Sequence, residues 1–198
     1  MTERCESMKA KLLSPPWARP SLTEEAMEAL RIIENDVWKE ASILFSAERE
    51  NKIQAGKSAP KGMQRYLNDV LVKKFTSNGW EGDAGYFTKN RTWIRITFRH
   101  QMSLGSDILD ALKVCKIEGM ELAIILAANR KTLNLISPND AAAIVSFEKL
   151  ENEILSLNGA LDIPLLIGEL TPFSSASREI NTGLKKARPR DTTIPTLE

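Results

Sequence analysis

An unbroken apolar run at residues 122–127 (Leu-Ala-Ile-Ile-Leu-Ala) constrains the fold of this 198-residue chain more than any other feature. The run has the length of a strand and no alternation of polar and apolar residues, which is the pattern of a central strand buried on both faces. A second such run lies at residues 163–168 (Ile-Pro-Leu-Leu-Ile-Gly). Because strands of this kind need helices on both faces of their sheet, the sequence predicts an α/β fold with a central mixed β-sheet.

A β-hairpin is expected at residues 86–98, with its turn at residues 89–91. In its second strand Trp93, Arg95, Thr97 and Arg99 alternate with apolar even-numbered residues. Successive side chains of a strand point to opposite faces of the sheet. One face of this strand is therefore predicted to be apolar and the other polar.

The remaining segments are punctuated by proline, glycine and helix-capping residues. We expect the chain to be irregular from its start through the prolines at residues 15–20. A helix should follow from Ser21 or Thr23 to about residue 45, then a mobile loop at 48–61 and a second helix at 63–75. Two further helices are expected, one capped by Ser106 or Asp107 and one at about 146–158. Residues 1–175 are thus predicted to form one domain, and residues 176–198 a basic flexible tail.

Composition narrows the class of protein. Hydrophobic residues make up 42% of the chain and charged residues 27%, as is usual for a globular domain. No apolar stretch approaches the roughly 20 residues that cross a bilayer, so we expect a cytoplasmic protein without a membrane partner. Cys5 and Cys115 are too few and too distant to indicate a disulfide framework or a metal site, and Cys115 is expected to be a buried, inert thiol.

The net charge of +1 hides an uneven distribution. Residues 48–99 contain 11 basic and 5 acidic side chains, whereas residues 100–177 contain 5 basic and 10 acidic ones. A basic block in a nearly neutral chain can form the positive surface that a phosphate backbone requires. A solvated surface without a ligand is the alternative interpretation.

Four stretches occur with the order and gaps of a known family. They are residues 66–69 with a helix end at 78–80, the hairpin at 86–98, residues 118–126 and residues 163–168. Together they resemble the type II restriction endonucleases of the BamHI, BglII and BstYI type over roughly residues 59–172. The resemblance implies a restriction-endonuclease-like (PD-(D/E)xK-like) fold and a homodimer packed through helices near 104–117 and 146–158. Another mixed α/β domain, or a monomer that buries the same helices, remains the alternative.

The resemblance places catalytic positions on residues that cannot perform the family's chemistry. In the family an Asp opens this segment, and a Glu followed by a Gln or Glu alternates on the second strand, so that carboxylates hold Mg²⁺. Here these positions are Tyr86, Arg95 and Thr97. A guanidinium stays protonated and repels a metal ion. The sequence therefore predicts a cleavage-deficient pseudo-nuclease without a metal cofactor, unless Asp83 substitutes in a rearranged Mg²⁺ site.

DNA contacts are predicted from position and charge. Arg99 and His100 match the residues just past the active-site strand with which this family reaches base edges, and Arg is the usual reader of guanine. For His100, a half-exposed residue at the start of a helix is an equally simple interpretation. The full set of predicted DNA-binding residues is Asn68, Lys73, Lys74, Lys89, Arg91, Arg95, Arg99, His100, Lys185, Lys186 and Arg188.

The sequence hypothesis is thus a homodimer that recognises double-stranded DNA without cutting it, as a regulator or as an occupant of a site shared with a modification system. An active Mg²⁺-dependent type II endonuclease using Asp83 is one alternative. A protein-interaction or inhibitor module without DNA binding is the other.

Overall fold

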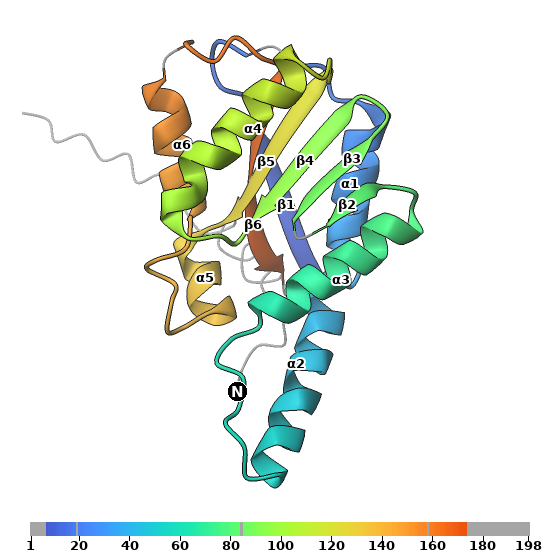
Figure 1. The fold of residues 1–198 in the computed structure, drawn as a ribbon, viewed down its shortest axis with the longest axis vertical. Helices are drawn as coiled ribbons and strands as arrows, with labels where there is room; N and C mark the ends of the chain where they lie inside the picture. Colours follow the sequence, from blue (N-terminus) through green and yellow to red (C-terminus); the bar gives the residue numbers. More distant parts are fainter. Residues whose placement is uncertain (1–6, 19, 84, 158, 174–198) are drawn as a thin grey trace, which may run out of the picture.

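A six-stranded mixed sheet organises the part of the chain that the structure describes (Figure 1). The computed structural model describes residues 7–18, 20–83, 85–157 and 159–173. The strands are β1 (Ser7–Leu13), β2 (Glu81–Asp83), β3 (Tyr86–Lys89), β4 (Thr92–Thr97), β5 (Leu122–Ala128) and β6 (Leu165–Phe173), in the spatial order β1-β6-β5-β4-β3-β2. β4, β5 and β6 run parallel, whereas β1, β2 and β3 each pair antiparallel with a neighbour. The predicted mixed sheet is confirmed.

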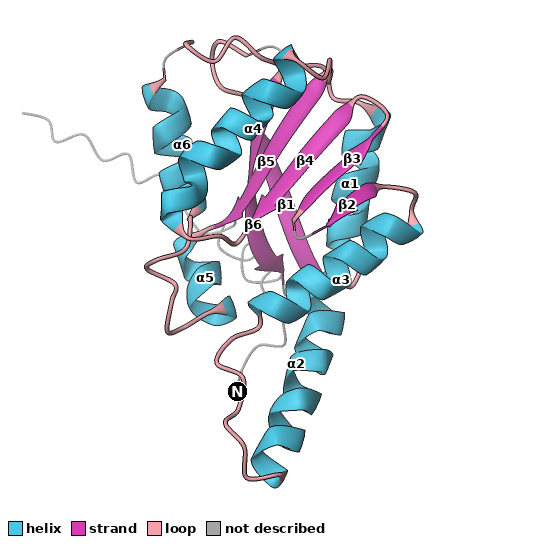
Figure 2. Ribbon diagram, viewed as in Figure 1, coloured by secondary structure: helices cyan, strands magenta, loops and turns pink. Residues whose placement is uncertain are grey.

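Helices cover both faces of this sheet (Figure 2). They are α1 (Glu24–Glu34), α2 (Val37–Gln54), α3 (Gln64–Ser77), α4 (Leu104–Lys116), α5 (Arg130–Ile136) and α6 (Phe147–Ser156). Ile94, Ile96 and Phe98 of the β4 segment belong to the core under α1, α2, α3 and α5. Trp93, on the opposite face, belongs to the core under α4 and α6. None of the described helices is long and apolar enough to cross a lipid bilayer.

The buried runs form the centre of the sheet, as predicted. Every residue of β5 is buried, and β5 pairs in parallel with β4 on one side and β6 on the other. Parallel strands place their carboxyl ends at one edge of the sheet, where side chains from distant segments can meet. The carboxyl end of β4 lies at this edge, beside the first turn of α3: Gln64 Nε2 donates to the carbonyl oxygen of Phe98 at 2.7 Å.

Two sequence expectations near the amino terminus were wrong. The opening predicted to be irregular contains β1, because residues 7–13 pair with β6 before the prolines begin. The helix predicted to run from Thr23 to about residue 45 divides at Asp36, whose φ of 58° lies in the left-handed region. Thr23 does cap α1, by accepting from the Ala26 amide at 3.1 Å.

Other corrections concern loops and caps. The predicted loop at 48–61 is helical as far as Gln54, where α2 ends. A short helix, α5, was not expected. α4 begins at Leu104, so Asp107 is not its cap but a buried residue inside the helix. The proposed tail at 176–198, with Lys185, Lys186 and Arg188, lies outside the described residues.

Candidate functional site

The positions that resemble catalytic residues lie side by side. Tyr86 of β3 is the direct cross-strand partner of Arg95 in β4, and Asp83 of β2 is the partner of Tyr86 on the other side. Directly opposed residues share a face of the sheet. The three side chains therefore form a row on the face covered by α4. Because neighbouring strands are about 4.8 Å apart, Asp83 is roughly 10 Å from the backbone of Arg95.

Arg95 is only 8% exposed, and α4 supplies acidic partners to it. Its Nη2 donates to Oδ2 of Asp110 at 3.1 Å, and its Nε lies 3.2 Å from Oδ1 of Asp107 without hydrogen-bond geometry. Tyr86 and Trp93 flank the guanidinium, with ring centroids 5.4 and 5.7 Å from its central carbon. Arg95 is therefore held by carboxylates inside the fold, an arrangement that disfavours the predicted contact with a DNA phosphate.

Asp107 is the centre of this network and is fully buried. Besides the contact with Arg95, its Oδ2 accepts from the Thr97 hydroxyl at 2.9 Å and its Oδ1 accepts from Arg99 Nη1 at 2.8 Å. A buried charge is tolerated only when it is paired and hydrogen-bonded, and here both oxygens have partners. The network therefore ties α4 to β4 through charge.

The residues present do not fit the Mg²⁺ that the family resemblance implies. Tyr86 and Thr97 carry hydroxyl groups where the metal site needs carboxylates, and both oxygens of Asp107 already accept from protein donors. Asp107 and Asp110, the two carboxylates beside Arg95, are paired with guanidinium groups, so the cluster offers a divalent ion no net negative charge. No group of three or more His, Cys, Asp or Glu side chains in the described ranges is placed to hold a metal ion.

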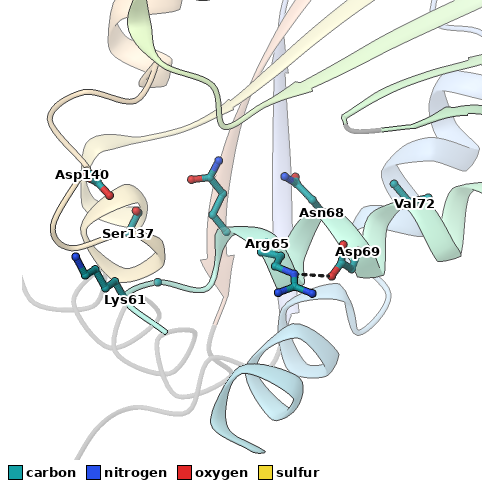
Figure 3. A pocket seen from close by; sticks show the side chains of 9 residues that line it. Lys61, Arg65, Asn68, Asp69, Val72, Ser137 and Asp140 are labelled. Carbon is teal, nitrogen blue, oxygen red and sulfur yellow. Dashed lines mark ion pairs between the residues drawn. The ribbon is translucent and has the colours of Figure 1, made fainter. Parts of the chain in front are cut away.

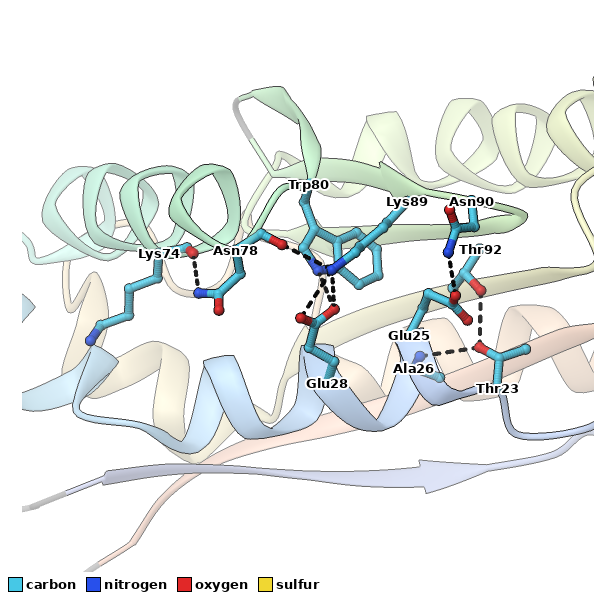
Figure 4. Close-up of polar contacts among 10 residues, drawn as sticks. All are labelled: Thr23, Glu25, Ala26, Glu28, Lys74, Asn78, Trp80, Lys89, Asn90 and Thr92. Carbon is cyan, nitrogen blue, oxygen red and sulfur yellow. Dashed lines mark hydrogen bonds and ion pairs between the residues drawn. The ribbon is translucent and has the colours of Figure 1, made fainter.

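Three predicted DNA contacts are also engaged in the fold. Lys89 pairs with Glu28 at 2.7 Å and donates to the Asn78 carbonyl, which ties α1 to the hairpin (Figure 4). Lys74 pairs with Glu40 at 2.7 Å. Arg91 pairs with Glu121 and donates to the Gly119 carbonyl. Lys74 and Lys89 tie elements together through partly buried pairs, whereas the pair of Arg91 is more than half exposed. A DNA contact by any of these three cations stays a prediction.

The predicted contacts also lie at two ends of the sheet. Arg91 precedes β4 and Arg99 follows it two residues after its end, and eight residue steps of extended chain separate them by up to roughly 26 Å. Lys89 and Arg91 are therefore remote from the carboxyl end of β4. Arg99 and His100 remain there, and both residues are exposed. Nδ1 of His100 accepts from the Met102 amide, which starts the next turn, so the helix-start interpretation of His100 also holds.

A groove of about 540 Å³ borders this end of the sheet (Figure 3). It runs along the first turns of α3 and faces the loop after α5. Its lining residues are Lys61, Gly62, Gln64, Arg65, Asn68, Asp69, Val72, Ser137 and Asp140. The bond from Gln64 to Phe98 joins the groove to the strand end that carries Arg99 and His100. Of the predicted residues, the structure thus brings Asn68, Arg99 and His100 to one end of the sheet, and Lys73 is exposed farther along α3.

The two basic side chains that line the groove, Lys61 and Arg65, have weak ion pairs or none among the described residues. Arg65 and Asp69 lie 3.7 Å apart on successive turns, with side chains 75% and 62% exposed. Such an exposed pair contributes only about 0.3–0.5 kcal/mol. Lys61 has no acidic partner among the residues that the structure describes. A phosphate group can therefore bind Arg65 and Lys61 without breaking a strong ion pair.

Sequence reasoning missed several residues of this region. Lys61 and Arg65 flank Gly62 at the start of a predicted helix, but their approach to the end of β4 depends on tertiary packing. Asp107 and Asp110 had a clearer signal. Asp107 stands three residues after Leu104 and four before Ala111, which are both buried, so a carboxylate occupies the apolar stripe of α4. A charge on such a stripe indicates a buried partner.

No protein-family model matches this sequence, and no curated protein is similar to it at a significant level. Among solved structures, a crystal structure of the restriction endonuclease BglII complexed with a DNA 16-mer is similar, with 17% identity, 82% of this chain and 74% of that chain covered, and a TM-score of 0.42. The crystal structure of free BglII has 14% identity, coverage of 84% and 80%, and a TM-score of 0.43. Likeness at this level carries no argument about the activity of this chain.

Proposed function

We propose that this chain binds double-stranded DNA at the carboxyl end of β4 and does not cleave it. The observation that carries the proposal is that Arg99 is held in place by a buried carboxylate and still reaches solvent. One nitrogen of its guanidinium is held by the buried Asp107, while the side chain remains 44% exposed beside the groove. Arg has five N–H donors in a rigid fork, so the outer donors are preorganised for a phosphate or a guanine edge.

The absence of cleavage rests on the chemistry of the row on β3 and β4. A metal-dependent nuclease needs negative charge at the metal position. The four charged residues of the network, two Arg and two Asp, sum to zero and neutralise one another. The rival hypothesis requires Asp83 to supply metal binding, yet Asp83 is exposed on the edge strand and distant from Arg95.

A homodimer is part of the proposal. α4 and α6 lie on the same face of the sheet (Figure 1), and each exposes apolar side chains. Leu109 of α4 is 64% exposed and Leu155 of α6 is 44% exposed. A second copy can cover these side chains, and a two-fold dimer would present two grooves to a palindromic duplex.

The test is binding and cutting of a random duplex library, with and without Mg²⁺, at about 50 and 200 mM salt. We expect binding that weakens steeply with salt, because phosphate contacts release counterions, and no cleavage in either condition. Arg99→Ala should reduce affinity and relax sequence preference. The matched control is Arg91→Ala, which removes the same charge at the opposite end of β4 and should leave binding unchanged.

The outcomes separate the hypotheses. Cleavage that requires Mg²⁺ and disappears in Asp83→Ala would establish the rearranged nuclease. A chain that binds no duplex at either salt concentration would favour the protein-interaction module. Equal losses in Arg99→Ala and Arg91→Ala would place the DNA elsewhere than at the carboxyl end of β4.

A further inference from the structure

α2 and the chain that returns from it form an arm, defined here as residues 46–61. The buried residues of α2 are Val37, Trp38 and Ala41, all within its first five positions. The last aromatic contact with the body is that of Phe45 with Tyr66, whose ring centroids are 5.7 Å apart. Beyond Phe45, nine further residues carry the helix about 14 Å away from this contact. In Figure 1 the arm projects from the end of the molecule where α3 begins.

The tip of the arm is a tightly closed turn. The Gly56 amide donates to the Ile53 carbonyl, the Lys57 amide donates to the Lys52 carbonyl at 2.8 Å, and Gly56 has a φ of 64°. These are the two bonds of a Schellman motif, in which the second residue after the cap is brought beside the third residue from the helix end. An apolar pair frequently occupies these two positions. Here they are Lys57 and Lys52, of which Lys52 also pairs with Glu48, so the turn places two cations side by side.

The arm also contains most of the basic residues at 48–99 that have no acidic partner among the described residues. Of the 11 basic residues at 48–99, seven have an acidic partner within 4.0 Å. The four without one among the described residues are Arg49, Lys57, Lys61 and Lys73. Three of these four lie on the arm, and Lys61 also lines the groove beside Arg65. With four basic residues against the acidic Glu48 and Glu50, the arm has a net charge of +2, and it begins where the groove ends.

We infer that the arm binds the phosphate backbone of the same duplex, next to the groove, and so lengthens the DNA contact. The inference rests on the proposed DNA binding. Phosphate contacts fix position and affinity but carry no direct sequence information. The arm therefore adds salt-dependent affinity, while Arg99 and His100 carry sequence preference. A projection of about 14 Å corresponds to at most about four base pairs at 3.4 Å each.

The test compares the full chain with an Arg49→Ala, Lys57→Ala, Lys61→Ala variant by fluorescence anisotropy on the duplex selected by the wild type. Each lost phosphate contact lowers the slope of log K against log salt by about 0.9, so we expect a decrease of about 2.7 with unchanged sequence preference. The matched control is Arg31→Ala, Lys39→Ala, Lys149→Ala, which removes three cations that have no acidic partner in the described part of the chain. Its slope should equal that of the wild type.

A second variant avoids the helix altogether. Lys57→Ala with Lys61→Ala changes only the returning chain and should reduce the slope by about 1.8, with a circular dichroism spectrum like that of the wild type. Trimming about four base pairs from the ends of the duplex should weaken the wild type but not the triple variant. If the wild type binds DNA and both arm variants keep its slope, the arm inference is refuted while the proposed function stands. If the wild type binds no DNA, both fail.

Discussion

Replacement of Asp107 by Asn tests the charged network beneath α4. Asp107 is fully buried, and its oxygens lie 2.8–3.2 Å from groups of Thr97, Arg95 and Arg99. Asn preserves the shape of the side chain but removes its charge: its amide oxygen can still accept from the guanidinium groups, while its NH2 group faces the Thr97 hydroxyl. Arg95, whose side chain is 10% exposed, would retain only the half-exposed Asp110 as an acidic partner.

Loss of one partner from a buried ion pair destabilises a protein by roughly 3–5 kcal/mol, because the remaining charge is left uncompensated. The lower end applies here, since Arg95 keeps one carboxylate and the Arg99 side chain reaches solvent. We therefore expect Asp107→Asn to reduce the free energy of unfolding by about 3 kcal/mol. In a domain of this size that corresponds to a decrease in Tm of roughly 6–12 °C.

Urea unfolding followed by tryptophan fluorescence measures this loss, and an unchanged m-value would show that the folded and unfolded states are otherwise comparable. The control is Arg91→Ala, whose pair with Glu121 is more than half exposed and should contribute less than about 1 kcal/mol. A variant combining Arg95→Met with Asp107→Leu should be more stable than Asp107→Asn, because the only charges that lose their partners, those of Asp110 and Arg99, reach solvent. If Asp107→Asn changes the free energy of unfolding by less than about 1 kcal/mol, the network does not form in solution and Arg95 is available to a ligand.

Three further predictions follow from individual side chains. Burial raises the pKa of the Cys115 thiol to about 11, so in a Cys5→Ser background we expect alkylation at pH 8 to be slow, to accelerate with pH, and to become fast on unfolding. The hydrogen bond from Asn90 chiefly lowers the pKa of Glu25. Its carboxylate should stabilise the fold above the unfolded pKa of about 4.3, and the stability difference between wild type and Glu25→Gln should vanish as the pH falls through the folded pKa. Leu109→Glu should yield monomers in sedimentation, whereas Leu135→Glu, an equally exposed change on α5, should not.

The centre of the fold was predictable because its signals are local. The apolar run of β5 can only be a buried strand or a buried helix, and its length favours the strand. The alternation in β4 predicted the two faces, and the structure places Ile94 and Trp93 in different cores. β1 was missed because its sequence, Ser-Met-Lys-Ala-Lys-Leu-Leu, has weak strand propensity. Its strand conformation depends on β6, which lies more than 150 residues away.

The candidate site was predictable only in part. The sequence was sufficient to show that Arg95 is not a metal ligand, because guanidinium chemistry does not depend on context. It did not reveal which carboxylate Arg95 meets, because that depends on how α4 lies across β4. The sequence predicted that Asp107 caps the helix, from its neighbours in the chain alone. The helix instead begins three residues earlier at Leu104, and Asp107 is buried within it. The groove along α3 joins segments about 70 residues apart, and no local pattern predicts it.

The number of basic residues in the sequence block is larger than the number of cations that the fold leaves available to DNA. The basic block carries 11 cations against 5 acids, but the fold brings acidic residues from α1, α2, α4 and the start of β5 to neutralise several of those cations. What remains at the carboxyl end of β4, along the groove and on the arm is Arg99, Arg65 and the three arm cations without an acidic partner in the described ranges. If only these five side chains contact phosphates, the slope of log K against log salt should be about −4.5 per protomer. Participation of all 11 cations would give about −10, and a measured value near −10 would mean that the internal ion pairs open when DNA binds.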